Sequence, residues 1–308
     1  MSSANPKPNS KPRDTFANFL VIGAMKCATT TLYQDLSLNP KIFLAVKELG
    51  LLKSSHVLSE AGRRDYASHF VSATVGQICG DISTEYSKSP EYPDVADHAR
   101  QVLGESAKVI YLVREPVARL LSHHQHMMNA RGAEQMGEDI NTEIDRRPEL
   151  VNYSRYAMQL TPWLQVFGRG NVHVIVFEEY VRNRVSTTNV VSDFLGVPRV
   201  ELRLDTDGAN RGESRRVANR LWAAIITSRF YRSGLRGMLP DSVRQIFAKT
   251  LLKPAAQRHI PASRATLARI IDQLAPDAEQ LQKMLGAADP LWDWDSVCNK
   301  YLSENATK

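Results

Sequence analysis

Residues 17–33 read ANFLVIGAMKCATTTLY, and this stretch decides the fold. Ala17 to Gly23 is a short apolar run with branched side chains that ends in glycine, which is typical of a buried strand. A helix is predicted after it, stopped by Pro40. The apolar face of that helix carries Leu32, Tyr33, Leu36 and Leu38. The opening unit is therefore a strand, a tight loop and a helix.

The loop that joins this strand to this helix has the composition of an anion-binding site. Free N–H groups at a helix start and the helix dipole both attract negative charge, and Lys26 adds a positive side chain. A Walker A loop, with glycine and lysine together at the helix start, does not match, and the dinucleotide pattern fails because Gly23 is the only glycine here. The predicted anion-binding residues are Gly23, Lys26, Cys27, Ala28, Thr29, Thr30 and Thr31.

Strands and helices alternate along the rest of the chain. Predicted strands span residues 77–83, 108–113 and 172–177, and predicted helices span 93–103, 117–129, 186–195 and 263–285, the last being one helix or two broken near Pro276. Segments 130–150 and 198–261 look irregular. The alternation predicts an α/β fold of three layers, in which a central parallel sheet is flanked by helices.

A second candidate site follows the clearest predicted strand. Residues 108–127 read KVIYLVREPVARLLSHHQHM. Arg114 stands at the carboxyl end of the strand, where ligands of open α/β sheets bind, and Ser122 follows two helical turns later. Because the planar fork of arginine can hold a phosphate through two hydrogen bonds, this segment predicts a second phosphate site.

The two loops in this order resemble those of the PAPS-dependent sulfotransferases, in particular soluble bacterial members similar to carbohydrate and heparan sulfate enzymes. PAPS is 3′-phosphoadenosine 5′-phosphosulfate. The family's 5′-phosphosulfate loop reads G-x-x-K-x-G-T-[TS], which Gly23, Lys26, Thr29 and Thr30 match, with Ala28 in place of the usual glycine. The family's 3′-phosphate loop begins R-[DE]-P, as at Arg114. The resemblance spans roughly residues 18–294. It implies a P-loop NTPase-like sulfotransferase fold, with Arg114 and Ser122 on the 3′-phosphate.

The resemblance also implies the reaction. The chain is expected to transfer a sulfuryl group from PAPS to a hydroxyl or amine of an acceptor, and to release 3′-phosphoadenosine 5′-phosphate without a metal. The expected acceptor is a carbohydrate, a glycolipid or a small metabolite. Lys26 is expected to stabilise the leaving oxygen. Glu48, which matches a K-E pair of the family, is the first candidate for the general base, and Asp81 is the second. Asp81 belongs to residues 79–86, which are similar to the family's G-E-K-[ST]-P-x-Y segment.

The positive surplus behind the net charge of +6 is concentrated in an arginine-rich segment. Residues 199–269 hold thirteen Arg and two Lys against five acidic residues. The resemblance places a cofactor-covering lid here, and Arg211 and Arg215 are the predicted lid contacts. His123 and His124, like Tyr153 and Tyr156, are assigned mainly to packing.

The predicted organisation is a disordered tail over residues 1–15, a single sulfotransferase domain over 16–300 with a helical lid region at about 199–261, and a C-terminal tail over 301–308. The start of the chain lacks the apolar region of a signal peptide, and no segment matches a membrane span of ~20 apolar residues. Three scattered cysteines fit a reducing setting and show no zinc spacing. We expect a cytoplasmic monomer or homodimer that binds no nucleic acid and at most touches a membrane surface weakly.

Two other functions are compatible with parts of the sequence. An atypical P-loop nucleotide kinase would use Asp81 as a magnesium ligand, and magnesium-independent turnover with PAPS would separate it from a sulfotransferase. A non-enzymatic binder of anionic ligands or membrane surfaces would use the mixed basic and apolar residues 221–252. Binding of liposomes that survives the loss of Lys26 would favour that second alternative.

Overall fold

The computed structural model describes residues 16–131, 137, 139–201, 216–218, 252–254 and 260–302. The predicted terminal tail 1–15, Arg211, Arg215 and most of the predicted lid lie outside these residues. The chain divides into two compact units, the first made of Met1–His123, Ile144–Arg203 and Ser263–Lys308, and the second of His124–Glu143 and Leu204–Ala262. Whether the chain acts as a single domain stays a prediction.

The first unit contains a five-stranded sheet with the order β2-β3-β1-β4-β5. The strands are β1 (Phe19–Gly23), β2 (Ile42–Leu44), β3 (Ile78–Ile82), β4 (Lys108–Val113) and β5 (Val172–Val176). Every neighbouring pair is parallel, with Leu20 opposite Asp81 and Val21 opposite Ile110. The predicted parallel α/β fold is therefore confirmed.

Burial explains why these segments form strands. All five residues of β1 are buried, as are five of the six residues of β4, and continuous apolar runs are expected where both faces of a parallel sheet are covered. The strands predicted at 77–83, 108–113 and 172–177 are all observed. The sequence analysis missed β2, whose three residues are too few to show a periodic pattern.

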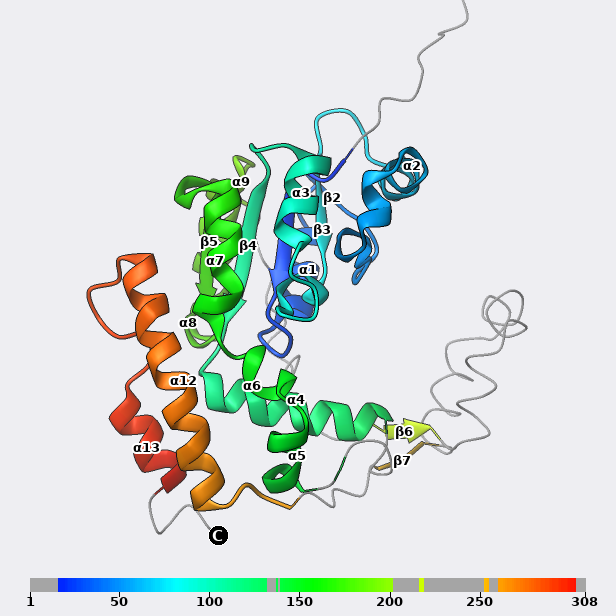
Figure 1. The fold of residues 1–308 in the computed structure, drawn as a ribbon. Helices are drawn as coiled ribbons and strands as arrows, with labels where there is room; N and C mark the ends of the chain where they lie inside the picture. Colours follow the sequence, from blue (N-terminus) through cyan, green and yellow to red (C-terminus); the bar gives the residue numbers. More distant parts are fainter. Residues whose placement is uncertain are drawn as a thin grey trace, which may run out of the picture. The chain divides into compact units, whose positions relative to one another are not determined.

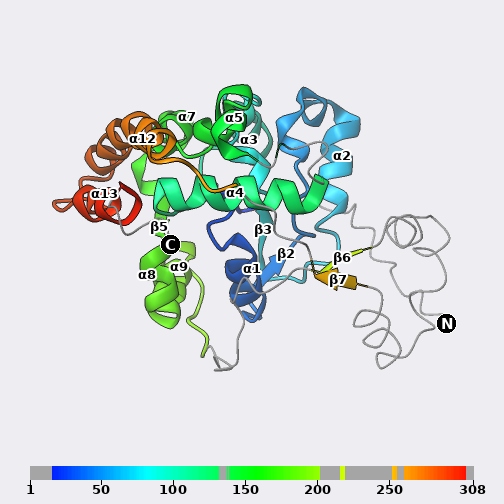
Figure 2. The same ribbon diagram turned by 90° about the horizontal axis from the view of Figure 1, so that it is seen from below.

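Helices cover both faces of this sheet (Figures 1 and 2). Helices α3 (Val95–Leu103) and α7 (Tyr156–Phe167) pack together on one face, and α1 (Thr29–Ser37) and α9 (Arg184–Leu195) pack together on the other. The remaining α-helices are α2 (Glu60–Ser68), α4 (Pro116–Arg131), α5 (Ile140–Arg146), α6 (Glu149–Asn152), α8 (Phe177–Arg182), α12 (Arg264–Leu285) and α13 (Trp294–Leu302). Of these, α4 and α5 each belong partly to the first unit and partly to the second. Short 3-10 helices are η1 (Leu51–Lys53), η2 (Ser55–Leu58), η3 (Thr84–Ser87) and η4 (Arg169–Asn171).

Several helix predictions need correction. Helix α12 runs without interruption through Pro276, where a break was the alternative. Leu38, predicted on the buried face of α1, follows the end of that helix and is 56% exposed, whereas Leu32 and Leu36 are buried. The segment 130–150, expected to be irregular, contains α5 and the start of α6.

The described part of the second unit is small. It includes the antiparallel strands β6 (Arg216–Ala218) and β7 (Leu252–Pro254). A bridge joins Asp139 to Ile260, and the Nε2 atom of His124 lies 3.1 Å from the Gly137 carbonyl oxygen. Across the described residues of both units, none of the helices has the length and apolar character needed to cross a bilayer.

Candidate active site

The predicted site residues lie where parallel strands end. The strand order reverses at β1, because the chain passes from β1 outward to β2 but returns through β3 to β4 on the other side of β1. In open α/β sheets, ligands bind beyond the carboxyl ends of the strands at such a switch point. The loops after β1 and β4 are neighbours at this point, since the two strands pair directly.

The loop after β1 leaves the start of α1 with unpaired donors. Its last residue, Ala28, is the N-cap of α1 and has a φ of 66°, and no side chain caps the helix. The backbone of Lys26 is also left-handed, with a φ of 73°. Helix N–H groups without a capping side chain, beside a lysine, form the arrangement that binds phosphate or sulfate. The left-handed Ala28 also explains why glycine is usual at this position of the family loop.

Gly23 is required by close packing at the start of the loop. Its φ is 145°, and a Cβ atom placed on it would lie 2.1 Å from the Oγ atom of Ser87. Cys27, in the middle of the loop, is fully buried, with its Sγ atom 3.8 Å from the Tyr156 hydroxyl. Burial raises the pKa of the Cys27 thiol to about 12, against the opposing effect of the Arg119 charge. Cys27 is therefore a neutral packing residue that shapes the loop.

The three threonines that begin α1 differ in exposure. Thr29 and Thr31 are buried, at 5% and 8% exposure, while Thr30 is exposed. Only the Thr30 side chain is therefore presented to solvent, whereas all three residues contribute backbone N–H groups to the first turn. Of the three threonine hydroxyl groups predicted at the anion site, the Thr30 hydroxyl is therefore the most accessible.

Arg114 connects the second loop to the first. Its Nη1 atom donates a hydrogen bond to the Lys26 carbonyl oxygen at 3.3 Å, and its guanidinium carbon lies 4.6 Å from the centre of the Phe177 ring. The Arg114 backbone N–H donates to the Tyr156 hydroxyl at 3.3 Å. The structure thus brings the Arg114 guanidinium of one predicted phosphate loop to the backbone of the other at one edge of the sheet.

Glu115 fixes the helix that carries Ser122. One of its carboxylate oxygens accepts hydrogen bonds from the N–H groups of Val117 and Ala118 at 2.7 and 3.1 Å, so it caps the start of α4. The other accepts from the Tyr301 hydroxyl at 2.9 Å. Ser122 follows on the same helix and is partly exposed. The cap therefore sets the position of Ser122 relative to Arg114.

Glu48 is a fixed and accessible carboxylate at the same edge. It has a left-handed φ of 66°, and its side chain is 38% exposed. Its Oε2 atom accepts hydrogen bonds from the Thr84 N–H at 2.8 Å and from the Thr84 hydroxyl at 3.1 Å, and its Oε1 atom pairs with Lys47. These contacts orient the carboxylate while leaving it accessible from solvent.

Asp81 occupies a different environment. It lies within β3 with no exposed surface, and its Oδ2 atom accepts hydrogen bonds from the Tyr86 hydroxyl at 2.6 Å and the Tyr66 hydroxyl at 3.1 Å. Burial raises the pKa of Asp81 to about 7, although both tyrosine hydrogen bonds act in the opposite direction. A carboxyl enclosed in this way is a structural group of β3, so Glu48 is the better placed of the two candidate bases.

The sequence analysis did not assign several residues that support the site. Phe177 lies under the Arg114 guanidinium, and Glu178 accepts from the Glu115 N–H at 2.9 Å. Both follow β5 directly, and β5 is the neighbour of β4. Their position at the carboxyl end of a predicted strand was the signal that could have identified them. Tyr156 has the packing role that was expected of it, and its hydroxyl also contacts the Arg114 backbone.

Comparison with known proteins identifies a family and several relatives. Residues 17–207 match the family model described as the sulfotransferase domain. Heparan sulfate glucosamine 3-O-sulfotransferase 3B1 of Mus musculus is 26% identical over 188 residues, covering 59% of this chain and 46% of that protein. Heparan sulfate glucosamine 3-O-sulfotransferase 6 of Homo sapiens is 25% identical over 202 residues, covering 63% and 56%. The chain spans about half the length of these relatives.

A solved structure supports the fold. The crystal structure of a sulfotransferase from Alicyclobacillus acidocaldarius superposes with a TM-score of 0.58 at 20% sequence identity. The superposition covers 88% of this chain and 96% of that one. The similarity extends to the arrangement of the strands and helices over most of the chain.

Proposed function

The chain belongs to the sulfotransferase domain family, and from this we propose that it transfers a sulfuryl group from PAPS to a hydroxyl group of a carbohydrate-containing acceptor. The hydrogen bond between Arg114 and the Lys26 carbonyl is the observation that carries the proposal, because it joins the two phosphate-binding loops. A ligand with anionic groups at both ends, such as PAPS, is what two adjacent cationic loops would bind.

The proposal assigns residues of this chain to both ends of the nucleotide. The uncapped N–H groups of α1, with Lys26 and Thr30, would hold the 5′-phosphosulfate. Arg114 and Ser122 would hold the 3′-phosphate. PAPS supplies the sulfuryl group, whose bond to the 5′-phosphate oxygen breaks as the bond to the acceptor oxygen forms.

The chain's own groups then have distinct tasks. Lys26 stabilises the negative charge that develops on the departing 5′-phosphate oxygen. Glu48 accepts the proton of the acceptor hydroxyl, and Thr84 keeps the carboxylate in position by donating through its N–H and hydroxyl. Asp81 supports the site indirectly by holding Tyr66 and Tyr86 against β3.

A carbohydrate acceptor is the class that we favour. Two relatives are named for transfer to a heparan sulfate glucosamine, and Glu48 occupies the position of the K-E pair in carbohydrate enzymes of the family.

The thiols of Cys27, Cys79 and Cys298 are free, which fits the expected cytoplasmic setting.

The proposal is tested by incubating the chain with sulfur-labelled PAPS and a set of neutral and anionic oligosaccharides in the presence of EDTA. We expect an acceptor-dependent labelled product together with stoichiometric 3′-phosphoadenosine 5′-phosphate. A parallel reaction with ATP and magnesium tests the kinase alternative. Phosphorylated product from ATP, with none from PAPS, would contradict the proposal.

A further inference from the structure

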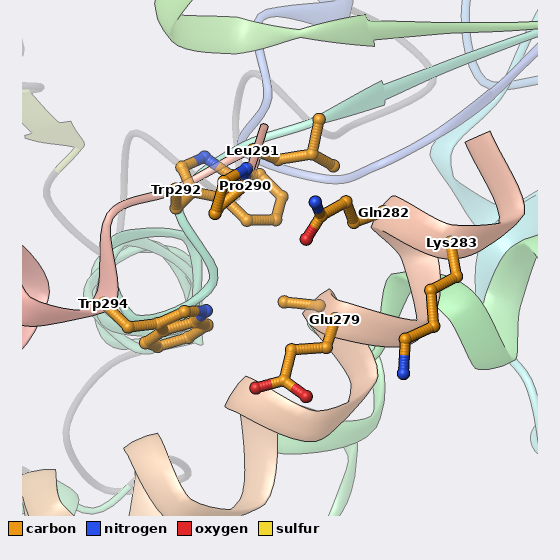
Figure 3. A pocket seen from close by; sticks show the side chains of 8 residues that line it. Glu279, Gln282, Lys283, Pro290, Leu291, Trp292 and Trp294 are labelled. Atoms are coloured by element: carbon orange, nitrogen blue, oxygen red, sulfur yellow. The ribbon is translucent and has the colours of Figure 1, made fainter. Parts of the chain in front are cut away.

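A cavity of about 290 Å³ lies away from the predicted nucleotide loops, in the C-terminal part of the first unit. It lies between the last turns of α12 and the segment that leads into α13 (Figure 3). Its lining includes Glu279, Gln282, Lys283, Pro290, Trp292 and Trp294. Its volume is near the lower end of small-molecule sites, which begin at roughly 300 Å³, so it suits a single small ring.

The aromatic wall of this cavity is held in place by hydrogen bonds. Trp292 donates from its Nε1 atom to Glu178 at 3.2 Å, and its ring centre lies 5.8 Å from that of Tyr156. Trp294 begins α13, whose first turn is capped by Asp293 through the N–H groups of residues 295 and 296 at 3.0 and 3.2 Å. The Trp292 indole and the backbone that carries Trp294 are therefore positioned before any ligand arrives.

The opposite wall is fixed in the same way. The Nε2 atom of Gln282 donates to the carbonyl oxygen of Ala287 at 3.2 Å, which ties the end of α12 to the loop that follows it. A preformed cavity binds more tightly than one that must be ordered by its ligand, because little conformational entropy is lost on binding.

The polar groups of the lining include acceptors with no partner of their own. Within the described residues, neither the Glu279 carboxylate nor the Gln282 amide oxygen accepts a hydrogen bond. Figure 3 shows the Gln282 amide oxygen directed into the hollow between the two indoles and Glu279, whereas the amine of Lys283 points away from it. Glu279 is exposed and Gln282 is partly exposed, so water can satisfy both acceptors in the free chain and the hydroxyl groups of a ligand can replace that water.

The charge of the lining favours a neutral ligand. Glu279 and Lys283 carry opposite charges one helical turn apart, so the lining has no net charge. An anionic ring would meet the Glu279 carboxylate, and a cation would meet the field of Lys283. The indole N–H of Trp292 already donates to Glu178 and the residue is only 7% exposed, so it offers a ligand a small apolar surface.

From these observations we propose that the cavity binds a neutral sugar ring of a glycan. The apolar C–H face of a pyranose packs on the partly exposed indole of Trp294, beside the small exposed part of Trp292, and its hydroxyl groups donate to Glu279 and Gln282. This site is separate from the proposed transfer site and does not depend on it, since none of its lining residues belongs to the two nucleotide loops.

The test uses the full chain and two neutral probes, maltotriose and chitotriose, followed by ligand-observed NMR and calorimetry. We expect dissociation constants on the order of 1 mM for at least one probe. Trp294→Ala is expected to weaken that binding by about tenfold or more, whereas Trp294→Phe keeps most of it. Gln280→Ala, at an exposed position of α12 outside the lining, is the matched control and should bind the probe as the unmodified chain does.

Trp294 is the better position for the test than Trp292, because Trp292 also contacts Glu178 and Tyr156 next to Arg114. Unchanged circular dichroism spectra and urea midpoints show that each variant is folded without reference to nucleotide binding, which keeps the two proposals separate. The proposal is overturned by the absence of neutral-sugar binding at about 20 mM, or by equal binding in Trp294→Ala. Preferential binding of choline, which would make the cavity an aromatic cage, or of a heparin tetrasaccharide, would also overturn it.

Discussion

The guanidinium of Arg114 donates a hydrogen bond to the backbone carbonyl of Lys26, 3.3 Å away, although 88 positions separate the two residues in the chain. The contact exists because β1 and β4 are parallel neighbours, so the loops that follow them leave the sheet at the same edge. It couples the residue expected to bind the 3′-phosphate to the residue expected to act at the sulfuryl group. A nucleotide that binds one loop therefore meets the other.

Replacing Lys26 tests the catalytic part of the account. Lys26→Ala is expected to lower turnover about 10²–10³-fold, because it removes a positive charge from the departing oxygen. Initial rates with labelled PAPS measure the effect, and the exposed Lys41→Ala is the control for a general loss of positive charge. Near-normal turnover in Lys26→Ala would remove this residue from the mechanism.

Replacing Arg114 and Ser122 tests the 3′-phosphate site. Arg114→Lys and Ser122→Ala are each expected to weaken the binding of adenosine 3′,5′-bisphosphate about ten- to a hundredfold, because charge-assisted hydrogen bonds to the phosphate are lost. The affinity for adenosine 5′-phosphate should stay nearly constant, since that ligand lacks the 3′-phosphate. Arg100→Ala, on the surface of α3, is the matched control. An equal loss for both ligands would assign these residues to general stability.

Replacing Glu48 tests the general base. Glu48→Gln keeps an amide oxygen to accept from the Thr84 N–H, so the loop should remain folded while proton acceptance is lost. Turnover is expected to fall about 10²–10⁴-fold with little change in nucleotide affinity. Glu60→Gln on the exposed surface of α2 serves as the control. If Glu48→Gln kept full turnover, another group would have to accept the proton.

Asp81 predicts a pH dependence of stability. Burial raises its pKa in the folded chain to about 7, well above the unfolded value of about 3.9. The folded chain therefore holds this proton more tightly, and the contribution of Asp81 to the free energy of unfolding falls as the pH rises from about 4 through about 7. Asp81→Asn replaces the titrating carboxyl with a neutral amide. The free energy of unfolding of this variant, relative to that of the unmodified chain, should therefore be higher at pH 8 than at pH 5.

Urea denaturation of both proteins at the two pH values measures this difference. Asn can still accept hydrogen bonds from Tyr66 and Tyr86 through its amide oxygen, so the comparison isolates the charge. A stability difference between the two proteins that is the same at both pH values would show that Asp81 titrates normally.

The left-handed backbone at Ala28 predicts a stabilising substitution. Ala28→Gly is expected to raise the free energy of unfolding by about 1 kcal/mol, because a Cβ atom is unfavourable at a φ of 66°. The melting temperature should rise by about 2 °C. Ala99→Gly inside α3 is expected to have the opposite sign, since glycine weakens a helix interior by about 1 kcal/mol. Destabilisation by Ala28→Gly would show that the Ala28 side chain makes a compensating contact.

The parts of the fold that the sequence predicted are those with a strong local pattern. Strands β1, β4 and β5 are largely apolar runs bounded by loops, and α9 ends at Gly196 as the sequence indicated. Helix α12 passes through Pro276, which local reasoning treats as a possible break. Its buried face on either side, including Leu274 and Ala278, shows that packing overrides this local preference.

The sequence was enough to propose a site residue where a basic side chain directly follows a predicted strand, as for Lys26 and Arg114. It was not predictable where the role depends on a contact between distant segments. Asp81 and Glu48 are both carboxylates in loops or strands near the same edge, and only the structure shows that Asp81 is enclosed by two tyrosines. The support of Arg114 by Phe177 also depends on the pairing of β4 with β5.

The central claim is that one nucleotide is bound by both loops at once, and calorimetry with a charge series of ligands tests it most directly. The full chain is titrated with adenosine 3′,5′-bisphosphate, adenosine 5′-phosphate and adenosine 3′-phosphate. The account predicts one site per chain and an affinity for the bisphosphate at least about tenfold above that for either monophosphate. A folded chain that takes up no bisphosphate, or that binds all three ligands equally, would contradict it.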